Sequence, residues 1–173
     1  YGLIYKFFSS GDYLRLEQKF SCMMKMDIAS CFYHIYTHTM SWAIKGKEQA
    51  KMSIRKDMFG NNFDILMRYA NYNETNGIIV GPEISRIFAE IILSRIDVAV
   101  LNTLRDGAGL NGLQVGVDYE IRRYVDDYFV YANSEETLKR ILASYNEQLE
   151  FYKLFINESK LQFSSRPFGS DLG

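Results

Sequence analysis

The sequence has few cysteines and prolines, almost no net charge and no long apolar run. Its two cysteines, Cys22 and Cys31, form neither a CxxC motif nor a disulfide framework, which fits a reducing compartment. The longest apolar stretches are too short to span a bilayer, and no signal peptide is visible. We therefore expect a soluble, cytoplasmic protein with no membrane partner.

The balanced charge bears on nucleic-acid binding, and the scarcity of proline bears on domain organisation. With 20 basic and 21 acidic residues, the chain lacks the strongly basic balance of a self-sufficient nucleic-acid binder. Either it is no such binder, or its electrostatic clamp lies outside these 173 residues. Only Pro82 and Pro167 interrupt the chain, so we predict one continuous unit. Because it begins at Tyr1 and ends without a helix stop, we expect part of a longer protein.

Apolar and aromatic residues are abundant, at 47% and 15%, which is enough to bury a core. Their spacing predicts strands over 20–28, 78–80 and 160–163. It also predicts a helix over 29–44 that residues 45–47 break, a helix over 63–72 that a polar turn over 73–77 ends, and a long core helix after Pro82 whose apolar face includes Ile84 and Ile87. A Gly-rich connection over 101–118, a hairpin centred on 126–127 and a last helix capped by Asn133 complete the prediction. This order predicts an α+β fold, an antiparallel sheet with helices packed on one face.

Two adjacent carboxylates, Asp126 and Asp127, lie between two apolar, β-preferring runs. Side chains alternate between the faces of a strand, so carboxylates kept from a buried face belong at a hairpin tip. By chance an Asp-Asp pair is expected about 0.6 times in this composition, but Tyr124-Val125-Asp126-Asp127 only about 0.002 times. The tetrapeptide therefore indicates more than a solvated turn, which is the structural alternative.

Asp27 ends another predicted strand. Phosphoryl transfer needs two metal ions about 3.5–4 Å apart, and carboxylates on adjacent strands can hold them. Asp27 and Asp126 are distant in sequence but can become neighbours in a sheet. With Asp127 they would form a cluster of like charges that is unfavourable unless cations occupy it. For Asp27 alone, an ordinary aspartate at a strand end is the alternative.

Four segments carry a resemblance to a known family: residues 25–33 (KMDIASCFY), 77–85 (GIIVGPEIS), 124–127 (YVDD) and 157–160 (NESK). In this order and approximate spacing they resemble the palm motifs of reverse transcriptases, over about residues 20–165. The resemblance implies a polymerase palm with a ferredoxin-like core over 1–173, with a remnant of the fingers at the N-terminus. The thumb and most of the fingers would be absent from this segment.

The resemblance implies a role for each matched residue. Asp27 and Asp126 would bind two Mg²⁺ ions, or Mn²⁺ in their place, with the Ile28 carbonyl completing one site and Asp127 supporting the pair. Phe32 would stack under the incoming sugar and exclude a 2′-hydroxyl, so that deoxynucleotides are preferred. A plain core phenylalanine is the alternative for Phe32.

Three further parts of the motifs receive substrate roles by the same resemblance. Gly81 and Pro82 would contact the nascent base pair and the template, where a helix N-terminus suits phosphate. Tyr124, from its position in the 124–127 motif, would stack on substrate. Lys160 would protonate the leaving pyrophosphate, and a solvated lysine at a strand end is the alternative.

The implied activity is that of an RNA-directed DNA polymerase, with an RNA template, a DNA product or primer and dNTPs. Residues 35–38 (IYTH), 42–47 (WAIKGK) and 85–91 (SRIFAEI) most resemble bacterial defence-associated, abortive-infection reverse transcriptases. That subgroup implies antiviral defence and leaves open a noncoding RNA, an accessory defence protein or a homo-oligomer. Val80 stands where many relatives have glutamine, which leaves room for template-independent or protein-primed synthesis.

Two other functions remain open at this stage. The palm could be retained as a catalytically silent scaffold that binds nucleic acid in a defence complex. A nucleotidyl cyclase is weaker, because its glycine-acidic hairpin signature is absent. His34 and His38 lie four residues apart without a third ligand, so we expect packing or hydrogen bonding there rather than zinc.

Overall fold

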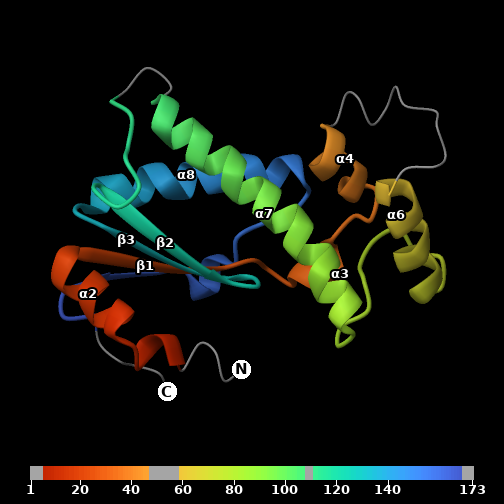
Figure 1. Ribbon diagram of the computed structural model, residues 1–173, viewed down its shortest axis with the longest axis horizontal. Coiled ribbons are helices and arrows are strands. Elements are labelled where there is room, and N and C mark those ends of the chain that lie inside the picture. Colours follow the sequence, from red (N-terminus) through yellow and green to blue (C-terminus); the bar gives the residue numbers. More distant parts are fainter. Residues whose placement is uncertain (1–5, 47–58, 108–110, 169–173) are drawn as a thin grey trace. The chain divides into compact units, whose positions relative to one another are not determined.

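The computed structural model of the protein describes residues 6–46, 59–107 and 111–168 (Figure 1). The chain forms two compact units. The first consists of Tyr1–Asp27, Asn102–Ser144 and Ile156–Gly173, and the second of Ile28–Leu101 and Tyr145–Phe155. No helix within the described ranges combines the length and the apolar character that a membrane crossing requires.

The first unit contains a four-stranded sheet with the order β2-β3-β1-β4. Its strands are β1 (Cys22–Asp27), β2 (Tyr119–Tyr124), β3 (Asp127–Ala132) and β4 (Gln162–Ser165), and each neighbouring pair is antiparallel. The chain enters β2 from α7 (Glu83–Asp106) and passes from β3 to β4 through α8 (Glu135–Phe151). This strand-helix-strand-strand-helix-strand order is ferredoxin-like. The predicted α+β class and antiparallel sheet are confirmed.

One face of the sheet is covered by α2 (Gly11–Lys19), a helix that the sequence pattern does not predict. Tyr13 and Leu16 of this helix pack against Phe129 and Tyr131 of β3. The helix begins at Ser10, whose hydroxyl accepts a hydrogen bond from the Tyr13 N–H. Burial of its apolar stripe stabilises this short helix, because nine residues are marginal on their own.

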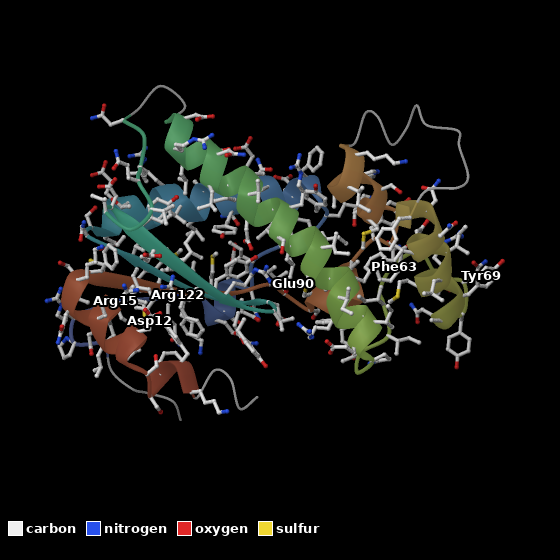
Figure 2. All side chains as sticks on the ribbon, viewed as in Figure 1. Asp12, Arg15, Phe63, Tyr69, Glu90 and Arg122 are labelled. Atoms are coloured by element: carbon white, nitrogen blue, oxygen red, sulfur yellow. The ribbon has the colours of Figure 1, made fainter. Side chains whose placement is uncertain are left out.

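Ion pairs also attach α2 to the sheet. Arg122 of β2 donates from Nε to Oδ2 of Asp12 over 3.2 Å and from Nη1 to Oε2 of Glu120 over 2.9 Å. Asp12 also accepts from Arg15, one turn along the helix (Figure 2). Burial raises the pKa of Asp12, but the hydrogen bonds and charges of Arg122 and Arg15 outweigh it and lower this pKa overall.

The opposite face of the sheet is buried as well. Met24 and Met26 of β1 lie beside Val130 and Tyr128 of β3, and all four are at most 1% exposed. The two central strands are therefore covered on both faces. The layer that α2 forms adds to the predicted packing of helices against the sheet.

The second unit contains α3 (Cys31–His34), α4 (Thr39–Lys45), α6 (Phe59–Ala70), most of α7 and the end of α8. Phe63 of α6 packs edge-on against Phe88 of α7, with ring centroids 5.0 Å apart. His38 Nδ1 lies 2.7 Å from Oδ2 of Asp64, which joins the start of α4 to α6. His34 Nδ1 contacts the Ala29 carbonyl at 3.0 Å. The expected hydrogen-bonding role of both histidines is confirmed.

The predicted single helix over 29–44 is wrong, because residues 35–38 interrupt it. The backbone groups of this segment bond to another part of the chain instead: Thr37 N–H donates to Thr75 O over 2.9 Å, and Gly77 N–H donates to Ile35 O over 2.9 Å. Gly46, at φ +87°, ends α4 as expected. Lys47, expected to share in that break, lies outside the described residues.

The second prediction that fails is the strand over 78–80. Ile78 N–H donates to Phe32 O over 2.8 Å, and residues 78–80 join no sheet. The predicted polar turn before them is confirmed: Tyr72, Asn73 and Gly77 have φ values of +52°, +63° and +82°.

Several element ends also differ from prediction. Residues 101–106, expected in the Gly-rich connection, continue α7 until Gly107 at φ +77°. Ile84 and Ile87, expected in its core face, are each 41% exposed. The cap of α8 is Ser134, whose Oγ accepts from Thr137 N–H, whereas the Asn133 side chain donates to Val117 O.

Candidate functional site

The carboxylates that the sequence singles out meet at one end of the sheet. Asp27 is the last residue of β1, Asp127 is the first of β3, and the two lie directly opposite each other in the antiparallel register. Asp126 precedes Asp127 in the connection from β2. Tyr124, the last residue of β2, lies opposite Asp127 on its other side. All four belong to the first unit.

The connection between β2 and β3 consists of Val125 and Asp126 alone. Two-residue hairpin loops require positive φ, and Val125 adopts φ +56°. A β-branched residue is strained there, and such strain is typical of functional sites. Arg123 Nη1 donates to the Val125 carbonyl over 3.1 Å, which helps to hold the turn.

The pKa values of Asp126 and Asp127 are both raised above the ordinary value. Burial raises the pKa of Asp126, and the charges of Asp27 and Asp127 add to this effect. Burial and the charge of Asp27 likewise raise the pKa of Asp127, against the opposing charges of Lys25 and Lys160. The site therefore concentrates negative charge that a cation would stabilise.

Lys160 supplies positive charge to this cluster. It ends η1 (Glu158–Lys160), the short 3-10 turn before β4, and its Nζ donates to Oδ2 of Asp27 over 2.9 Å. The hydrogen bond to Asp27 and then its charge raise the pKa of Lys160. The Lys160 side chain is 61% exposed, whereas that of Asp27 is 8% exposed.

The described part of the chain has no set of three or more His, Cys, Asp or Glu side chains already spaced as metal ligands. The chemistry of Asp27, Asp126 and Asp127 nevertheless fits a divalent cation, because Mg²⁺ and Mn²⁺ prefer carboxylate oxygens. Asp27 and Asp127 lie at paired strand ends, Asp126 lies in the adjoining turn, and the three carboxylates interact electrostatically. Oδ2 of Asp27 is turned towards Lys160.

The remaining predicted site residues belong to the second unit. Ile28 follows Asp27 in the chain and is buried. Phe32 lies in α3 and is partly buried. Gly81 is exposed at φ +118°, and the Pro82 carbonyl accepts from Ser85 N–H over 3.1 Å, at the start of α7.

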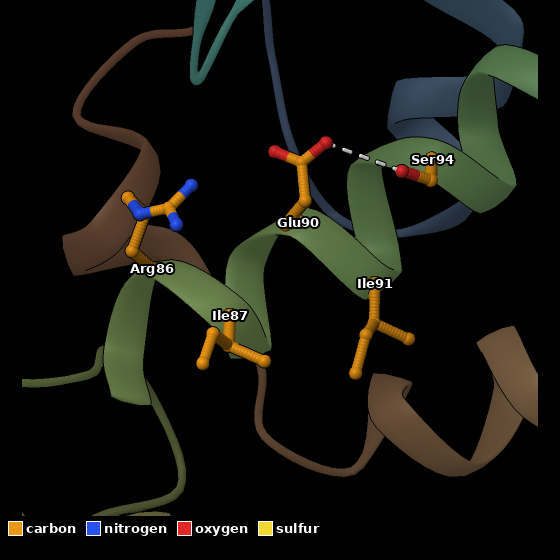
Figure 3. Close-up of a pocket in the computed structure, with 5 residues that line it drawn as sticks. All are labelled: Arg86, Ile87, Glu90, Ile91 and Ser94. Carbon is orange, nitrogen blue, oxygen red and sulfur yellow. Dashed lines mark hydrogen bonds between the residues drawn. The ribbon is translucent and has the colours of Figure 1, made fainter. Parts of the chain in front are cut away.

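A shallow pocket of about 370 Å³ lies along α7 (Figure 3). Glu90 and Ser94 form one edge, where the Ser94 hydroxyl donates to Glu90 over 3.3 Å. Ile87 and Ile91 supply its apolar floor. Arg86, the fifth lining residue, pairs with Glu83 and lowers the pKa of that carboxyl through their hydrogen bonds.

Sequence reasoning assigned no role to Asn157, although this residue opens the motif that contains Lys160. In the structure it contacts Asp27 through both its backbone and its side chain. The available signal was an asparagine just before a short turn, a common capping pattern. Only the tertiary structure shows that the side-chain amide of Asn157 lies against Asp27.

The chain matches one protein family over nearly its whole length. Residues 5–169 match the family described as "Reverse transcriptase (RNA-dependent DNA polymerase)". No curated protein matches the sequence closely enough to count as a relative.

Solved telomerase structures share the fold. An apo telomerase from Candida tropicalis has a TM-score of 0.61 and 13% identity, over 89% of this chain and 31% of that chain. A telomerase from Candida albicans, solved with a TWJ fragment of telomeric RNA, has a TM-score of 0.59 and 12% identity, over 92% and 31% respectively. The chain thus spans about a third of the length of the telomerase chains that it matches.

Proposed function

The chain belongs to the reverse transcriptase (RNA-dependent DNA polymerase) family, and from this premise we propose that it forms the palm of a polymerase that copies RNA into DNA. The observation that carries the proposal is the register that sets Asp27 opposite Asp127, with Asp126 in the adjoining turn. Carboxylates gathered from adjacent strands suit nucleotidyl transfer, in which the protein mainly positions groups and stabilises charge.

The residues of this chain would divide the work of the reaction. Asp27, Asp126 and Asp127, with the Ile28 carbonyl, would hold two Mg²⁺ or Mn²⁺ ions. Such ions, when bound, activate the attacking 3′-hydroxyl and neutralise charge on the phosphates. The 3′-hydroxyl would lose its proton to solvent, and its oxygen would bond to the α-phosphorus as the bond to pyrophosphate breaks. The Lys160 ammonium would donate a proton to the leaving pyrophosphate.

Substrate selection would rest on the second unit and on Tyr124. We propose that the Phe32 ring lies against the sugar of the incoming dNTP and that Gly81 and Pro82 contact the nascent base pair. An RNA template is supported by family membership, and one telomerase of the same fold was solved with telomeric RNA. The DNA primer or product, the fingers and the thumb complete the proposed assembly.

We place this activity in bacterial antiviral defence, on the resemblance of residues 35–38, 42–47 and 85–91 to defence-associated relatives. A noncoding RNA or an accessory defence protein would then be a partner. A second candidate, untemplated or protein-primed DNA synthesis, is favoured by Val80. This residue is 55% exposed and, unlike the glutamine of many relatives, has no side-chain hydrogen-bonding group.

The test assays the purified full-length protein in the presence of Mg²⁺ and dNTPs, with and without an RNA template and a DNA primer. We expect template-dependent incorporation that Asp126→Asn abolishes without a loss of folded structure by circular dichroism. Equal incorporation by the mutant would contradict the metal assignment. Sequencing the product distinguishes the candidates: a complement of the template supports reverse transcription, whereas template-free products support the second candidate. Absence of synthesis would leave a palm that serves as a nucleic-acid-binding scaffold.

A further inference from the structure

Asn157 fixes the backbone at the end of β1. The ladder between β1 and β4 extends only from the pair Cys22–Ser165 to the pair Lys25–Gln162, so it stops before Asp27. Beyond it, Asn157 N–H donates to the Asp27 carbonyl over 2.8 Å. This hydrogen bond attaches the segment before η1 to the residue that ends β1.

The side chain of Asn157 has one orientation that satisfies both of its ends. Its Oδ1 accepts from the backbone N–H of Ser159 over 3.2 Å and from the Ser159 hydroxyl over 2.7 Å, which caps η1. A backbone N–H can only donate, so the oxygen must face Ser159. The amide nitrogen is then left facing Asp27, and Nδ2 donates to Oδ2 over 3.3 Å.

The same carboxylate oxygen receives the charged donor of the turn. Lys160 Nζ lies 2.9 Å from Oδ2 of Asp27, and Lys160 N–H donates to the Asn157 carbonyl over 3.1 Å. Asn157 therefore contacts the proposed metal ligand directly and also begins the turn that carries the proposed proton donor.

We propose that Asn157 is a positioning residue, which orients the Asp27 carboxylate and sets the position of Lys160 relative to it. This inference rests on the proposed function for its kinetic consequence. Partners that orient metal ligands typically change metal affinity or activity by about 10–100-fold when mutated. The Nδ2–Oδ2 hydrogen bond is the contact that would carry the effect.

The decisive variant is Asn157→Ser in the full-length protein. Serine caps helical turns about as well as asparagine, but it is too short to reach Asp27 and it adds no charge. We expect a Tm close to that of the wild type, a fall in kcat of about 10–100-fold and little change in the KM for dNTP. The Mg²⁺ concentration for half-maximal rate should rise by a similar factor.

Ser159→Ala is the matched control, because it removes the hydroxyl from Oδ1 but leaves the amide nitrogen against Asp27. We expect kcat and Mg²⁺ dependence close to those of the wild type. An equal loss in Ser159→Ala, or wild-type kinetics in Asn157→Ser, would overturn the positioning role.

Calorimetric titration with Mn²⁺ separates this inference from the proposed function. If the wild type makes no DNA but binds Mn²⁺ more tightly than Asn157→Ser does, Asn157 still orients Asp27 and only the polymerase assignment fails. Identical Mn²⁺ affinity in the two proteins would overturn the role of Asn157, whatever the activity.

Discussion

Asp27 and Asp127 lie opposite each other in the antiparallel pairing of β1 with β3, with Asp126 beside them and the Lys160 ammonium 2.9 Å from Asp27. Like charges directly opposite on neighbouring strands are destabilising. The site therefore lowers the stability of the fold in return for a concentrated negative charge. Stability measurements can detect this cost separately from catalysis.

Asp127→Asn should raise Tm at pH 7 in the absence of divalent ions, by about 2 °C. The pKa of Asp127 is raised above its ordinary value of 3.8, so the folded state binds more protons than the unfolded state does. The contribution of this raised pKa to stability is fully present below pH 3.8, where the Asp127 carboxyl is protonated. It is lost as pH rises through the folded pKa and the carboxyl becomes charged. The gain in Tm should therefore shrink as pH falls, which thermal unfolding from pH 3.5 to 7.5 would show.

Asp12→Asn is the control of opposite sign in the same unit. The pKa of Asp12 is lowered overall, so its contribution is present above the ordinary value of 3.8 and is lost as pH falls through the folded pKa. This variant should lower Tm at neutral pH and have less effect in acid. The same sign for both variants would contradict the electrostatic account.

Lys160→Met should lower kcat by about 100-fold with little change in the KM for dNTP, because general acid catalysis contributes typically this much. The effect on Tm should be small, since the ammonium is largely exposed. Lys160→Arg retains the charge beside Asp27 but is a poor proton donor. The measurement is the single-turnover rate. If Lys160→Arg reacts as fast as the wild type, Lys160 contributes only its charge.

Phe32→Ala should raise the incorporation of ribonucleotides relative to deoxynucleotides, because the smaller side chain would admit a 2′-hydroxyl. The readout is the ratio of kcat/KM for the two sugars. Tyr33→Ala, the next residue and 69% exposed, is the control for general loosening of α3. An unchanged ratio in Phe32→Ala would reject the proposed sugar selection and leave Phe32 as a core residue.

Gly77→Ala should lower the free energy of unfolding by about 1–3 kcal/mol more than Gly46→Ala does, the usual cost of an overpacked methyl group. Both glycines have positive φ, +82° and +87°, so both substitutions introduce backbone strain. A Cβ at Gly77 would lie 3.1 Å from the Tyr33 carbonyl oxygen, whereas one at Gly46 would meet nothing within 4 Å. Urea unfolding of the two variants measures the difference, and equal losses would show that the close approach to Tyr33 has no energetic weight.

Elements with strong local patterns were predictable. The strand before Asp27, the hairpin around Asp126, the helix after Pro82 and the last helix all follow the expected periodicity. The helix break at residues 35–38 was not predictable, because it depends on backbone hydrogen bonds to residues 75–77. Its local sequence remains apolar at helical spacing.

The N-terminal helix α2 shows the same limit. Tyr13 and Leu16 become core residues only because Phe129 and Tyr131, more than a hundred positions away, present an apolar surface to them. Burial on that surface, rather than intrinsic propensity, stabilises such a short helix. Local sequence patterns do not reveal that apolar surface, because its residues are distant in the chain.

The sequence by itself determined the family, the strand ends that carry Asp27 and Asp127, and the hairpin that carries Asp126. These features depend on residue type and short-range alternation, which act within a few positions. The tertiary structure alone decided that Asp27 and Asp127 lie opposite each other, that Lys160 contacts Asp27, and that Asn157 lies beside that carboxylate. Pairing register is set by the burial of whole strand faces, so it exists only after the sheet has formed.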